Sequence, residues 1–232
     1  LLKPLSGSGK MFCYDSPEYV KDMGTPERFT SVVTDYRSGT VQSKNLSNKQ
    51  KAVFLDRDGV INKYVGFLRN IDEFELNPTI TDAIKKINSS GYLCIVITNQ
   101  PVIARGEMTW GELEEIHNKM ETELGFAGAY LDGIYFCPHH PHKGYEGEVV
   151  ELKIDCDCRK PKPGMLIKAA EDFNIALESS WMIGDGENDI KAGIAAGCRT
   201  GLVNGEGSDY KEGDFGQNYT CKSLLEFVEK ML

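Results

Sequence analysis

Long runs of apolar residues are missing from this chain of 232 residues, and no stretch approaches the length that crosses a membrane. An excess of basic residues is missing as well, since 26 Lys and Arg stand against 35 Asp and Glu, for a formal net charge of −9. General binders of nucleic acid or of anionic membranes need the opposite balance, so both classes are disfavoured. The opening residues, LLKPLSGSGK, lack the apolar core of a signal peptide. We therefore expect a cytoplasmic protein, and the initial Leu indicates a fragment or a processed chain.

Cysteine, by contrast, is well represented. The sequence has seven cysteines, an odd number, and three of them lie between positions 137 and 158. An odd and clustered set is typical of a reduced compartment and a metal site rather than of a disulfide scaffold. The length is enough for one sizeable domain, or for one domain with an appendage.

Beyond Lys51 the sequence alternates between short apolar runs and amphipathic segments. The apolar runs are nearly continuous, as in strands covered on both faces of a parallel sheet. They cover residues 51–56, 92–99, 133–137, 180–185 and 200–204. Helix starts are expected after Pro78, at the capping box of Thr109 and Glu112, after Pro163 and after Ser223. This alternation predicts an α/β fold with an open, doubly wound parallel sheet.

Two carboxylates close the first expected strand, in the segment KAVFLDRDGVINK. Asp56 and Asp58 are two residues apart, so they point the same way along an extended chain. Like charges on one face repel unless a cation lies between them or one of the two carboxylates is protonated. A lone DxDG would be an ordinary Asp-rich turn. Here the strand at 180–185 also ends in acids, in GDGEND, and ligands of such sheets bind at the carboxyl ends of the strands.

The polar residues at these strand ends predict phosphate chemistry. Asp56, Asp58 and Asp185, brought to one point, would form an oxygen cage suited to Mg²⁺. One carboxylate could attack phosphorus and form an aspartyl-phosphate, while the second moves the protons of the leaving group and of water. Groups that could hold phosphate oxygens or balance their charge are supplied by Thr98, Asn99 and Lys160.

These motifs together resemble the haloacid dehalogenase-type phosphatase superfamily. The segments TNQPVIARGE, LDGIYFCPHHP and CDCRKPKPGM are similar to the D-glycero-D-manno-heptose 1,7-bisphosphate 7-phosphatases and, next, to the histidinol-phosphate phosphatases. The resemblance covers about residues 50–205. It implies a Rossmann-like core with no large cap, and removal of the 7-phosphate of the sugar bisphosphate in nucleotide-activated heptose biosynthesis.

The resemblance also implies roles at the catalytic centre. Asp56 would be the nucleophile and a Mg²⁺ ligand, and Asp58 the general acid and base, with its backbone carbonyl on the metal. Asp185 would be the other Mg²⁺ ligand, supported by Asp189. Lys160 would meet the phosphoryl oxygens during catalysis.

Substrate binding would fall to Thr98, Asn99, Arg105 and Arg159. Two positions depart from the family pattern. Pro101-Val102 stands where Ser-Gly is usual, and Gly186 stands where Lys or Arg is usual. Both departures are expected to alter the fit of the substrate without touching the chemistry.

Cysteine and histidine gather in the segments CPHHPH and CDC, which offer four soft ligands for a tetrahedral Zn²⁺. As in the resembling family, the expected ligands are Cys137, His139, Cys156 and Cys158, with His140 or His142 as alternatives to His139. Because no position is left open for water, the Zn²⁺ would be structural. It would pin the loop 138–157 and so aim Arg159 and Lys160 at the site. His117, on the apolar face of an expected helix, is interpreted as a packed core residue rather than a ligand.

Residues 1–49 fall outside the phosphatase pattern. EYVKDMGTPERF (18–29) resembles the end of a sugar-phosphate nucleotidyltransferase domain, although the Gly-rich nucleotide loop of such domains is absent from the sequence. The alternative is a plain helical extension that Pro26 starts. We expect a nucleotidyltransferase remnant with a polar linker at 1–49, fused to a phosphatase domain at 50–232.

Three other functions compete with the heptose bisphosphate phosphatase. One is a histidinol-phosphate phosphatase, which shares the Zn²⁺ cluster. Another is a polynucleotide end phosphatase, which the net charge of −9 disfavours. The third is a non-catalytic binding module, which would be expected to lose Asp56 or Asp58.

Overall fold

The computed structural model describes residues 7–8, 11, 16, 18–144, 146–205 and 210–232, so Cys13 lies outside the described residues. The chain divides into two compact units, Leu1–Asn45 and Leu46–Leu232. Among the described residues, no helix has the length and the apolar character needed to span a membrane.

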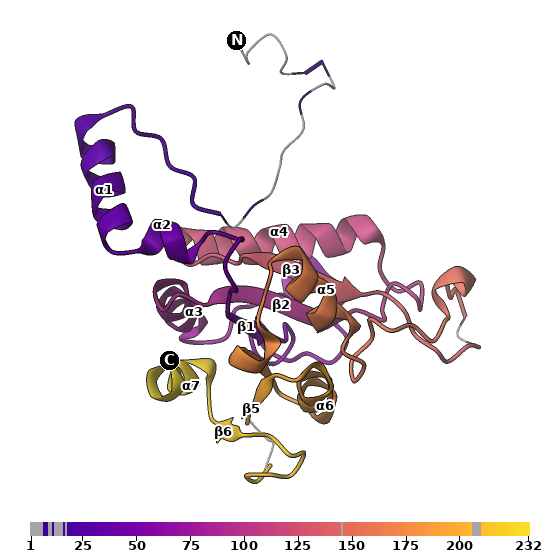
Figure 1. Ribbon diagram of the computed structural model, residues 1–232. Helices are drawn as coiled ribbons and strands as arrows, with labels where there is room; N and C mark the ends of the chain where they lie inside the picture. Colours follow the sequence, from indigo (N-terminus) through magenta and orange to yellow (C-terminus); the bar gives the residue numbers. More distant parts are fainter. Residues whose placement is uncertain (1–6, 9–10, 12–15, 17, 145, 206–209) are drawn as a thin grey trace. The chain divides into compact units, whose positions relative to one another are not determined.

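The described part of the first unit contains two helices, α1 (Pro26–Arg37) and α2 (Thr40–Ser43) (Figure 1). Thr25 caps α1, because its hydroxyl accepts a backbone N–H of the first turn. Pro26 is therefore the first residue of α1, as in the alternative of a helical extension. The segment before the helix is tied to it at Asp35, which accepts hydrogen bonds from Tyr19 (2.7 Å) and Lys21 (2.8 Å).

Six parallel strands form the sheet of the second unit, in the order β3-β2-β1-β4-β5-β6. Their bounds are β1 (Ala52–Leu55), β2 (Leu93–Asn99), β3 (Gly133–Cys137), β4 (Trp181–Gly184), β5 (Arg199–Val203) and β6 (Tyr219–Cys221). Leu55 pairs with Val96 on one side and with Ile183 on the other, so the carboxyl ends of the three central strands meet at one edge. The expected parallel sheet is confirmed, and β6 is a strand that the sequence did not predict.

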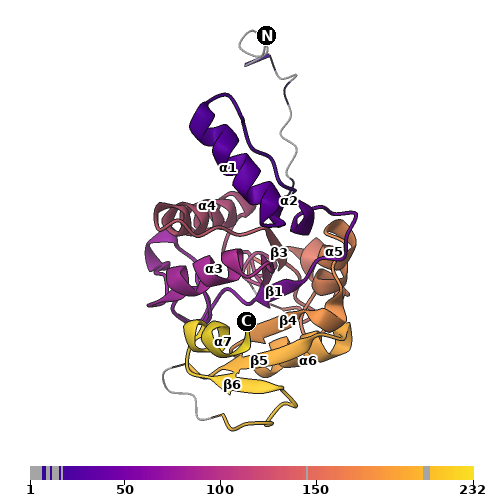
Figure 2. The ribbon, with the colours of Figure 1, turned by 60° about the vertical axis from the view of Figure 1, so that its left-hand side comes forward.

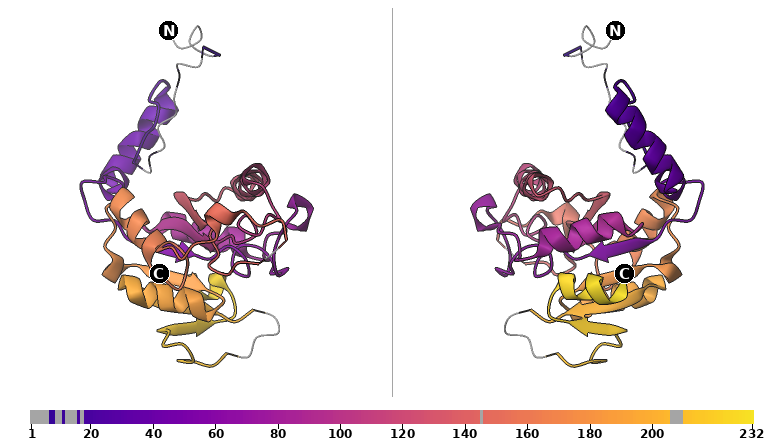
Figure 3. Two further views of the ribbon diagram at one scale, coloured as in Figure 1. Left: turned by 90° about the vertical axis from the view of Figure 1, so that its right-hand side faces the viewer. Right: turned by 90° about the vertical axis from the view of Figure 1, so that its left-hand side faces the viewer.

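Helices cover both faces of this sheet, as Figure 2 shows and the two further views of Figure 3 repeat. One face is covered by α3 (Ile80–Ser89), α4 (Trp110–Phe126) and α7 (Leu224–Met231). The other is covered by α5 (Gly164–Asp172) and α6 (Glu187–Ala196). In β1, Val53 and Leu55 pack on the first group while Ala52 and Phe54 pack on the second, and all four are fully buried. Burial on both sides explains why the strands read as unbroken apolar runs.

In the part of the chain that the structure describes, the connections carry the short 3₁₀ helices η2 (Ile71–Glu73), η3 (Val150–Leu152) and η4 (Leu177–Ser179). The expected helix starts are confirmed as well. Thr109 accepts the N–H of Glu112, and the carboxylate of Glu112 accepts the N–H of Thr109. Ser223 caps α7 and Pro163 occupies the N-cap of α5.

Candidate active site

Three carboxylates meet at the carboxyl edge of the sheet. Asp56 follows β1, Asp185 follows β4 and Asp189 lies in the first turn of α6, and oxygen atoms of all three lie within 4.8 Å of one another. Lys160 reaches the same group from the connection to α5. Its Nζ atom is 2.8 Å from Oδ1 of Asp56 and 2.6 Å from Oδ1 of Asp189, and it also donates to the carbonyl of Ile97.

The electrostatics of this group favour a bound cation. Burial and the neighbouring carboxylates of Asp189 and Asp185 raise the pKa of Asp56, although Lys160 opposes them. Burial and Asp189 raise the pKa of Asp185 to about 6. Burial disfavours the charge of Lys160, but Asp189 and Asp56 outweigh it and raise the pKa of the ammonium. Three carboxylates around one ammonium, all with oxygen ligands to offer, fit a hard divalent ion such as Mg²⁺.

Gly59, the glycine of DxDG, leaves the room that these carboxylates need. Its φ is +87°, a left-handed conformation that favours glycine. A Cβ atom at this position would lie 2.0 Å from Oδ2 of Asp185. The turn after β1 can therefore approach the carboxylate that follows β4 only because residue 59 has no side chain.

The side chain of Asp58 lies outside the group of three carboxylates. Its Oδ1 accepts from Nδ2 of Asn62 and from Nη2 of Arg57, both at 3.0 Å. Its Oδ2 accepts from Nη2 of Arg57 at 2.9 Å and from Nε2 of Gln100 at 3.0 Å. The side chain of Asp58 is 19% exposed and faces a cavity. The contact of its backbone carbonyl with Mg²⁺ stays a prediction.

A cavity of about 250 Å³ opens beside these groups. Its wall includes every residue expected at the catalytic centre or on the substrate except Arg105, namely Asp56, Asp58, Thr98, Asn99, Arg159, Lys160, Asp185 and Asp189. The guanidinium carbon of Arg105 lies instead 4.1 Å from the ring centroid of Phe67, and Phe67 lines the cavity. Contact between Arg105 and a substrate therefore stays a prediction.

The residues expected to bind phosphate also make contacts within the protein. The hydroxyl of Thr98 accepts from Nε2 of Gln100 at 2.9 Å. The amide of Asn99 binds the backbone of Lys160, since Oδ1 accepts its N–H and Nδ2 donates to its carbonyl, both at 3.0 Å. Asn99 thus holds the segment that carries the lysine, a function that the sequence did not reveal. One N–H of its Nδ2 remains for another partner.

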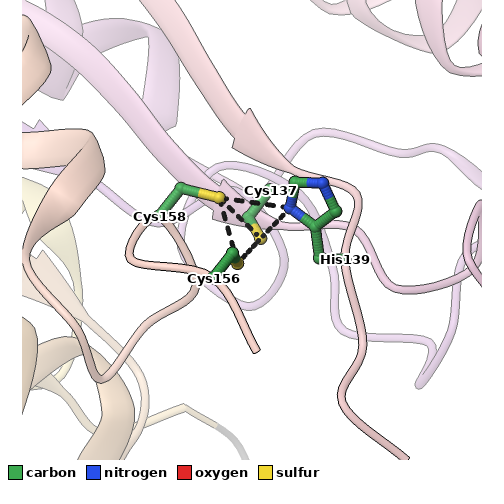
Figure 4. A group of neighbouring side chains, drawn as sticks. All are labelled: Cys137, His139, Cys156 and Cys158. Carbon is green, nitrogen blue, oxygen red and sulfur yellow. Dashed lines mark hydrogen bonds between the residues drawn. The ribbon is translucent and has the colours of Figure 1, made fainter. Parts of the chain in front are cut away.

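Cys137, His139, Cys156 and Cys158 form a second group of metal-ligating side chains (Figure 4). The Sγ atom of Cys158 lies 3.2 Å from the Sγ atoms of Cys137 and Cys156, and 3.3 Å from Nδ1 of His139. Four soft ligand atoms at such distances fit a tetrahedral Zn²⁺. Burial raises the pKa of Cys137, so its thiolate is disfavoured without a cation nearby.

The two alternative histidines are engaged elsewhere. Nδ1 of His140 accepts the backbone N–H of His142 at 3.2 Å, and neither ring belongs to the group of four. Arg159 follows the group directly, and its Nη1 donates to the carbonyl of His139 at 3.2 Å while the residue lines the cavity. The geometry therefore links the cysteine group to the cavity wall through one residue.

Three residues that hold Asp58 were missed by sequence reasoning: Arg57, Asn62 and Gln100. All three are buried, with exposed fractions of 2% or less. The available signal was the presence of polar side chains inside segments expected to be buried, where each must find a partner.

Comparisons with known proteins identify relatives of this chain. A family model described as HAD-hydrolase-like matches residues 157–227. The D-glycero-beta-D-manno-heptose-1,7-bisphosphate 7-phosphatase of Salmonella typhi is 43% identical over 158 residues, which are 68% of this chain and 82% of that protein. The protein of the same name from Yersinia pestis is 38% identical over 182 residues, 78% of this chain and 95% of the relative.

Solved structures give the same result. The D,D-heptose 1,7-bisphosphate phosphatase from B. bronchiseptica, complexed with magnesium and phosphate, is similar with a TM-score of 0.66 and 32% identity, covering 78% of this chain and 98% of that one. A putative HAD-like phosphatase from Mesorhizobium loti has a TM-score of 0.67 and 32% identity, covering 78% and 87%. With relatives of this identity and coverage, the chain belongs to the D-glycero-β-D-manno-heptose-1,7-bisphosphate 7-phosphatase family of HAD-like hydrolases.

Proposed function

We propose that this protein is a phosphoric monoester hydrolase that removes the 7-phosphate of D-glycero-D-manno-heptose 1,7-bisphosphate, in nucleotide-activated heptose biosynthesis. The observation that carries the proposal is the group of Asp56, Asp185, Asp189 and Lys160 on the wall of a cavity. It occurs in a chain whose relatives, at 38–43% identity, bear the name of that activity.

Two metal ions are part of the proposal. Mg²⁺ would be held by Asp56 and Asp185, with support from Asp189 and a backbone contact at Asp58, and when bound it would neutralise charge on the phosphoryl group. Zn²⁺ would be held by Cys137, His139, Cys156 and Cys158, with no position left open for water, and would therefore be structural. Thiol ligands of this kind fit the reduced cytoplasm, where we place the protein.

The carboxylates of the chain supply the chemistry in two steps. A carboxylate oxygen of Asp56 attacks phosphorus, the bond between phosphorus and O7 of the sugar breaks, and protonated Asp58 gives its proton to O7. Asp58 then takes a proton from a water molecule whose oxygen attacks phosphorus, and the bond to Asp56 breaks as inorganic phosphate leaves. The hydrogen bonds that Asp58 accepts in the structure suit the ionised form that the second step requires.

The remaining residues would bind and orient the substrate. Lys160, fixed between two carboxylates, would stabilise the charge that develops on the phosphoryl oxygens. Thr98 and the remaining N–H of Asn99 would hold the same oxygens. Arg159 on the cavity wall, and Arg105 beside Phe67, would contact the distal part of an anionic substrate.

We further propose that the natural protein is a fusion, with residues 1–49 as the end of a nucleotidyltransferase domain and its linker, and residues 50–232 as the phosphatase domain. The resemblance of EYVKDMGTPERF to such a domain supports this, and nucleotidyl transfer to the remaining 1-phosphate would be the next chemical step. The reading frame upstream of this sequence, once sequenced, tests the fusion directly.

The decisive experiment for the activity is a substrate panel. The purified chain with Mg²⁺ is assayed on both anomers of the heptose bisphosphate, on histidinol phosphate and on a 5′-phosphorylated oligonucleotide, by kcat/KM. We expect a preference of at least ~10²-fold for a heptose bisphosphate, of the size that a correctly paired polar site supplies. Phosphorus NMR should show that the 1-phosphate is retained. A preference for histidinol phosphate would show that this compound, and not the heptose bisphosphate, is the substrate. If wild type and Asp56→Asn were equally inactive on every compound of the panel, the proposed activity would be overturned.

A further inference from the structure

Arg57 lies between the two aspartates of the first motif and is fully buried. Arginine is almost never fully buried unless it is paired. Every side of this guanidinium has a partner. Its Nε and Nη2 atoms donate to Asp58 (3.3 Å to Oδ1 from Nε, 3.0 and 2.9 Å from Nη2), Nη2 also reaches Oε1 of Gln100 (3.1 Å), and Nη1 lies 3.4 Å from Nε2 of His117.

His117 contributes to this network from α4. It is 8% exposed and packs edge-on against Phe136, with 5.6 Å between ring centroids, so the expected core position is confirmed. Burial, followed by the charge of Arg57, lowers the pKa of His117 to about 4. The neutral ring has one nitrogen without a hydrogen, which can accept from Arg57. Arg57 is therefore supported on the side that faces away from the cavity.

Gln100 closes the network on the other side. Its Nε2 donates to Oδ2 of Asp58 while its Oε1 accepts from Arg57, so the three side chains form a closed ring of hydrogen bonds. A carboxylate held by a bidentate guanidinium and an amide has little rotational freedom. Its remaining exposed surface faces the cavity, where the proposed reaction takes place.

Stability alone does not account for an arginine at this position. Buried ion pairs contribute little net stability, and apolar side chains of similar size often replace them at no loss. The carboxylate of this ion pair is that of Asp58, which in the proposed reaction must be oriented toward two different oxygen atoms, that of the leaving sugar and that of the attacking water. We propose that Arg57 is a positioning residue, held by His117 from α4, which fixes the carboxylate of Asp58 in the orientation for proton transfer.

This inference rests on the proposed function of Asp58, and it predicts a dependence on the leaving group. A sugar alkoxide leaves only with a proton, whereas p-nitrophenolate leaves without one. Variants of Arg57 should therefore lose turnover of a sugar phosphate but still transfer the phosphoryl group of p-nitrophenyl phosphate to the enzyme. Release of that group from the enzyme requires Asp58 again, so the phosphoenzyme should accumulate.

The experiment compares wild type with Arg57→Lys, Arg57→Met, His117→Gln and His117→Phe. Lys keeps the charge but cannot form the bidentate contact, and Gln keeps an acceptor where Phe does not. We expect kcat on heptose bisphosphate to fall about 10²-fold in both Arg57 variants, as for a misplaced catalytic group, with KM nearly unchanged. With p-nitrophenyl phosphate, stopped flow should show a burst of one nitrophenolate per chain before slow turnover. His117→Phe should show a smaller fall in kcat with the same burst. His117→Gln, which keeps an acceptor for Arg57, should have a kcat closer to that of wild type.

A double-mutant cycle provides the control. In the background of Asp58→Asn, which has no proton to move, Arg57→Lys should cost little further activity. Equal losses of burst rate and of sugar phosphate turnover, or additive losses in the cycle, would show that Arg57 acts only on the structure of the site and would overturn the proposal. If Arg57→Met does not fold, the Lys and His117 variants decide. Failure of the proposed function is distinguishable, because wild type itself would then not hydrolyse heptose bisphosphate, while the comparison can still be made on another alkyl phosphate.

Discussion

The amide of Asn99 and the peptide N–H and carbonyl of Lys160 form two hydrogen bonds, each 3.0 Å long. Lys160 also lies two residues beyond Cys158, one of the four grouped Zn²⁺ ligands proposed above. The backbone of Lys160 is therefore held from the end of β2, and the chain leading to it is held at the cysteine group. Arg159 has no such contact with Asn99 and binds a carbonyl of the cysteine group instead.

This double support predicts an unequal effect of losing Zn²⁺. In Cys158→Ser we expect no bound Zn²⁺, a marked rise in KM through Arg159, and only a modest fall in kcat, because Asn99 still holds Lys160. Cys158→Ser with Asn99→Ala should lose kcat by about 10²-fold. Elemental analysis and steady-state kinetics on heptose bisphosphate check this, with Cys198→Ser, a buried cysteine outside the group, as the matched control. A Zn²⁺-free Cys158→Ser chain with wild-type KM would show that the cysteine group does not position Arg159.

Asp56→Asn should abolish turnover and leave the fold intact, since the amide cannot attack phosphorus. The same change should raise Tm in the absence of Mg²⁺. Burial and the neighbouring carboxylates raise the pKa of Asp56 in the folded protein, so its ionised form is a cost that the neutral amide removes. Phosphate release and thermal melts check both parts, with Asp82→Asn at an exposed position as control. Activity within about tenfold of wild type would exclude Asp56 as the nucleophile.

Stabilisation by Mg²⁺ should grow with pH. The pKa of Asp185 is raised from 3.8 to about 6, so the metal-free fold binds the proton more tightly than the unfolded chain. The stability that protonated Asp185 contributes is fully present below pH 3.8 and is lost as the pH rises through about 6. Mg²⁺ offsets the charge that then appears, so the rise in Tm on adding Mg²⁺ should be larger at about pH 7.5 than at about pH 5. Asp185→Asn should flatten this dependence, and a Tm rise independent of pH would contradict the assignment.

Lys160 and Arg159 should differ in which kinetic constant they change. Lys160→Met removes a charge that would stabilise the transition state, so kcat should fall by about 10²–10³-fold. It also leaves Asp56 and Asp189 without their counterion, so the metal-free protein should melt at a lower temperature. Arg159→Ala should mainly raise KM, because the residue would bind the distal anionic part of the substrate. The reverse pattern, with Lys160→Met altering only KM, would reassign the two roles.

The sheet could be predicted from the sequence because burial on both faces leaves nearly unbroken apolar runs in β1, β2 and β4, between which the expected helices alternate. β6 has only three residues, Tyr219–Cys221, too few for a periodic signal. The residues of α6 were not identified either, and Gly193 in its middle disfavours a helix by propensity. The structure shows why glycine is there: a Cβ atom would lie 2.6 Å from Cγ2 of Thr200 and 2.7 Å from Cβ of Met182, so α6 packs directly on the sheet.

The candidate site, like the fold, could be predicted from the sequence only in part. Charged and thiol ligands lie at predictable places, since strand ends and short Cys and His spacings are visible in the sequence. Partners brought together by the fold are not visible: the contact of Arg57 with His117 spans 60 positions, and that of Asn99 with Lys160 spans 61. The placement of Arg105 against Phe67, outside the cavity wall, depends on packing in the same way.

The two groups of metal-ligating residues share one further property, which follows from the order of the strands. In the cysteine group, Cys137 and His139 precede the connection after β3, and Cys156 and Cys158 follow it. In the carboxylate group, Asp56 precedes the same connection, and Asp185 and Asp189 follow it. The pairing of β1 with β4 joins the same two stretches of chain. If the second unit were cut within that connection, neither half would contain all the ligands of either ion. Two separately expressed halves would therefore regain catalysis only by reassembling, with each ion bridging the cut, and the molecule could serve as a split reporter of metal availability.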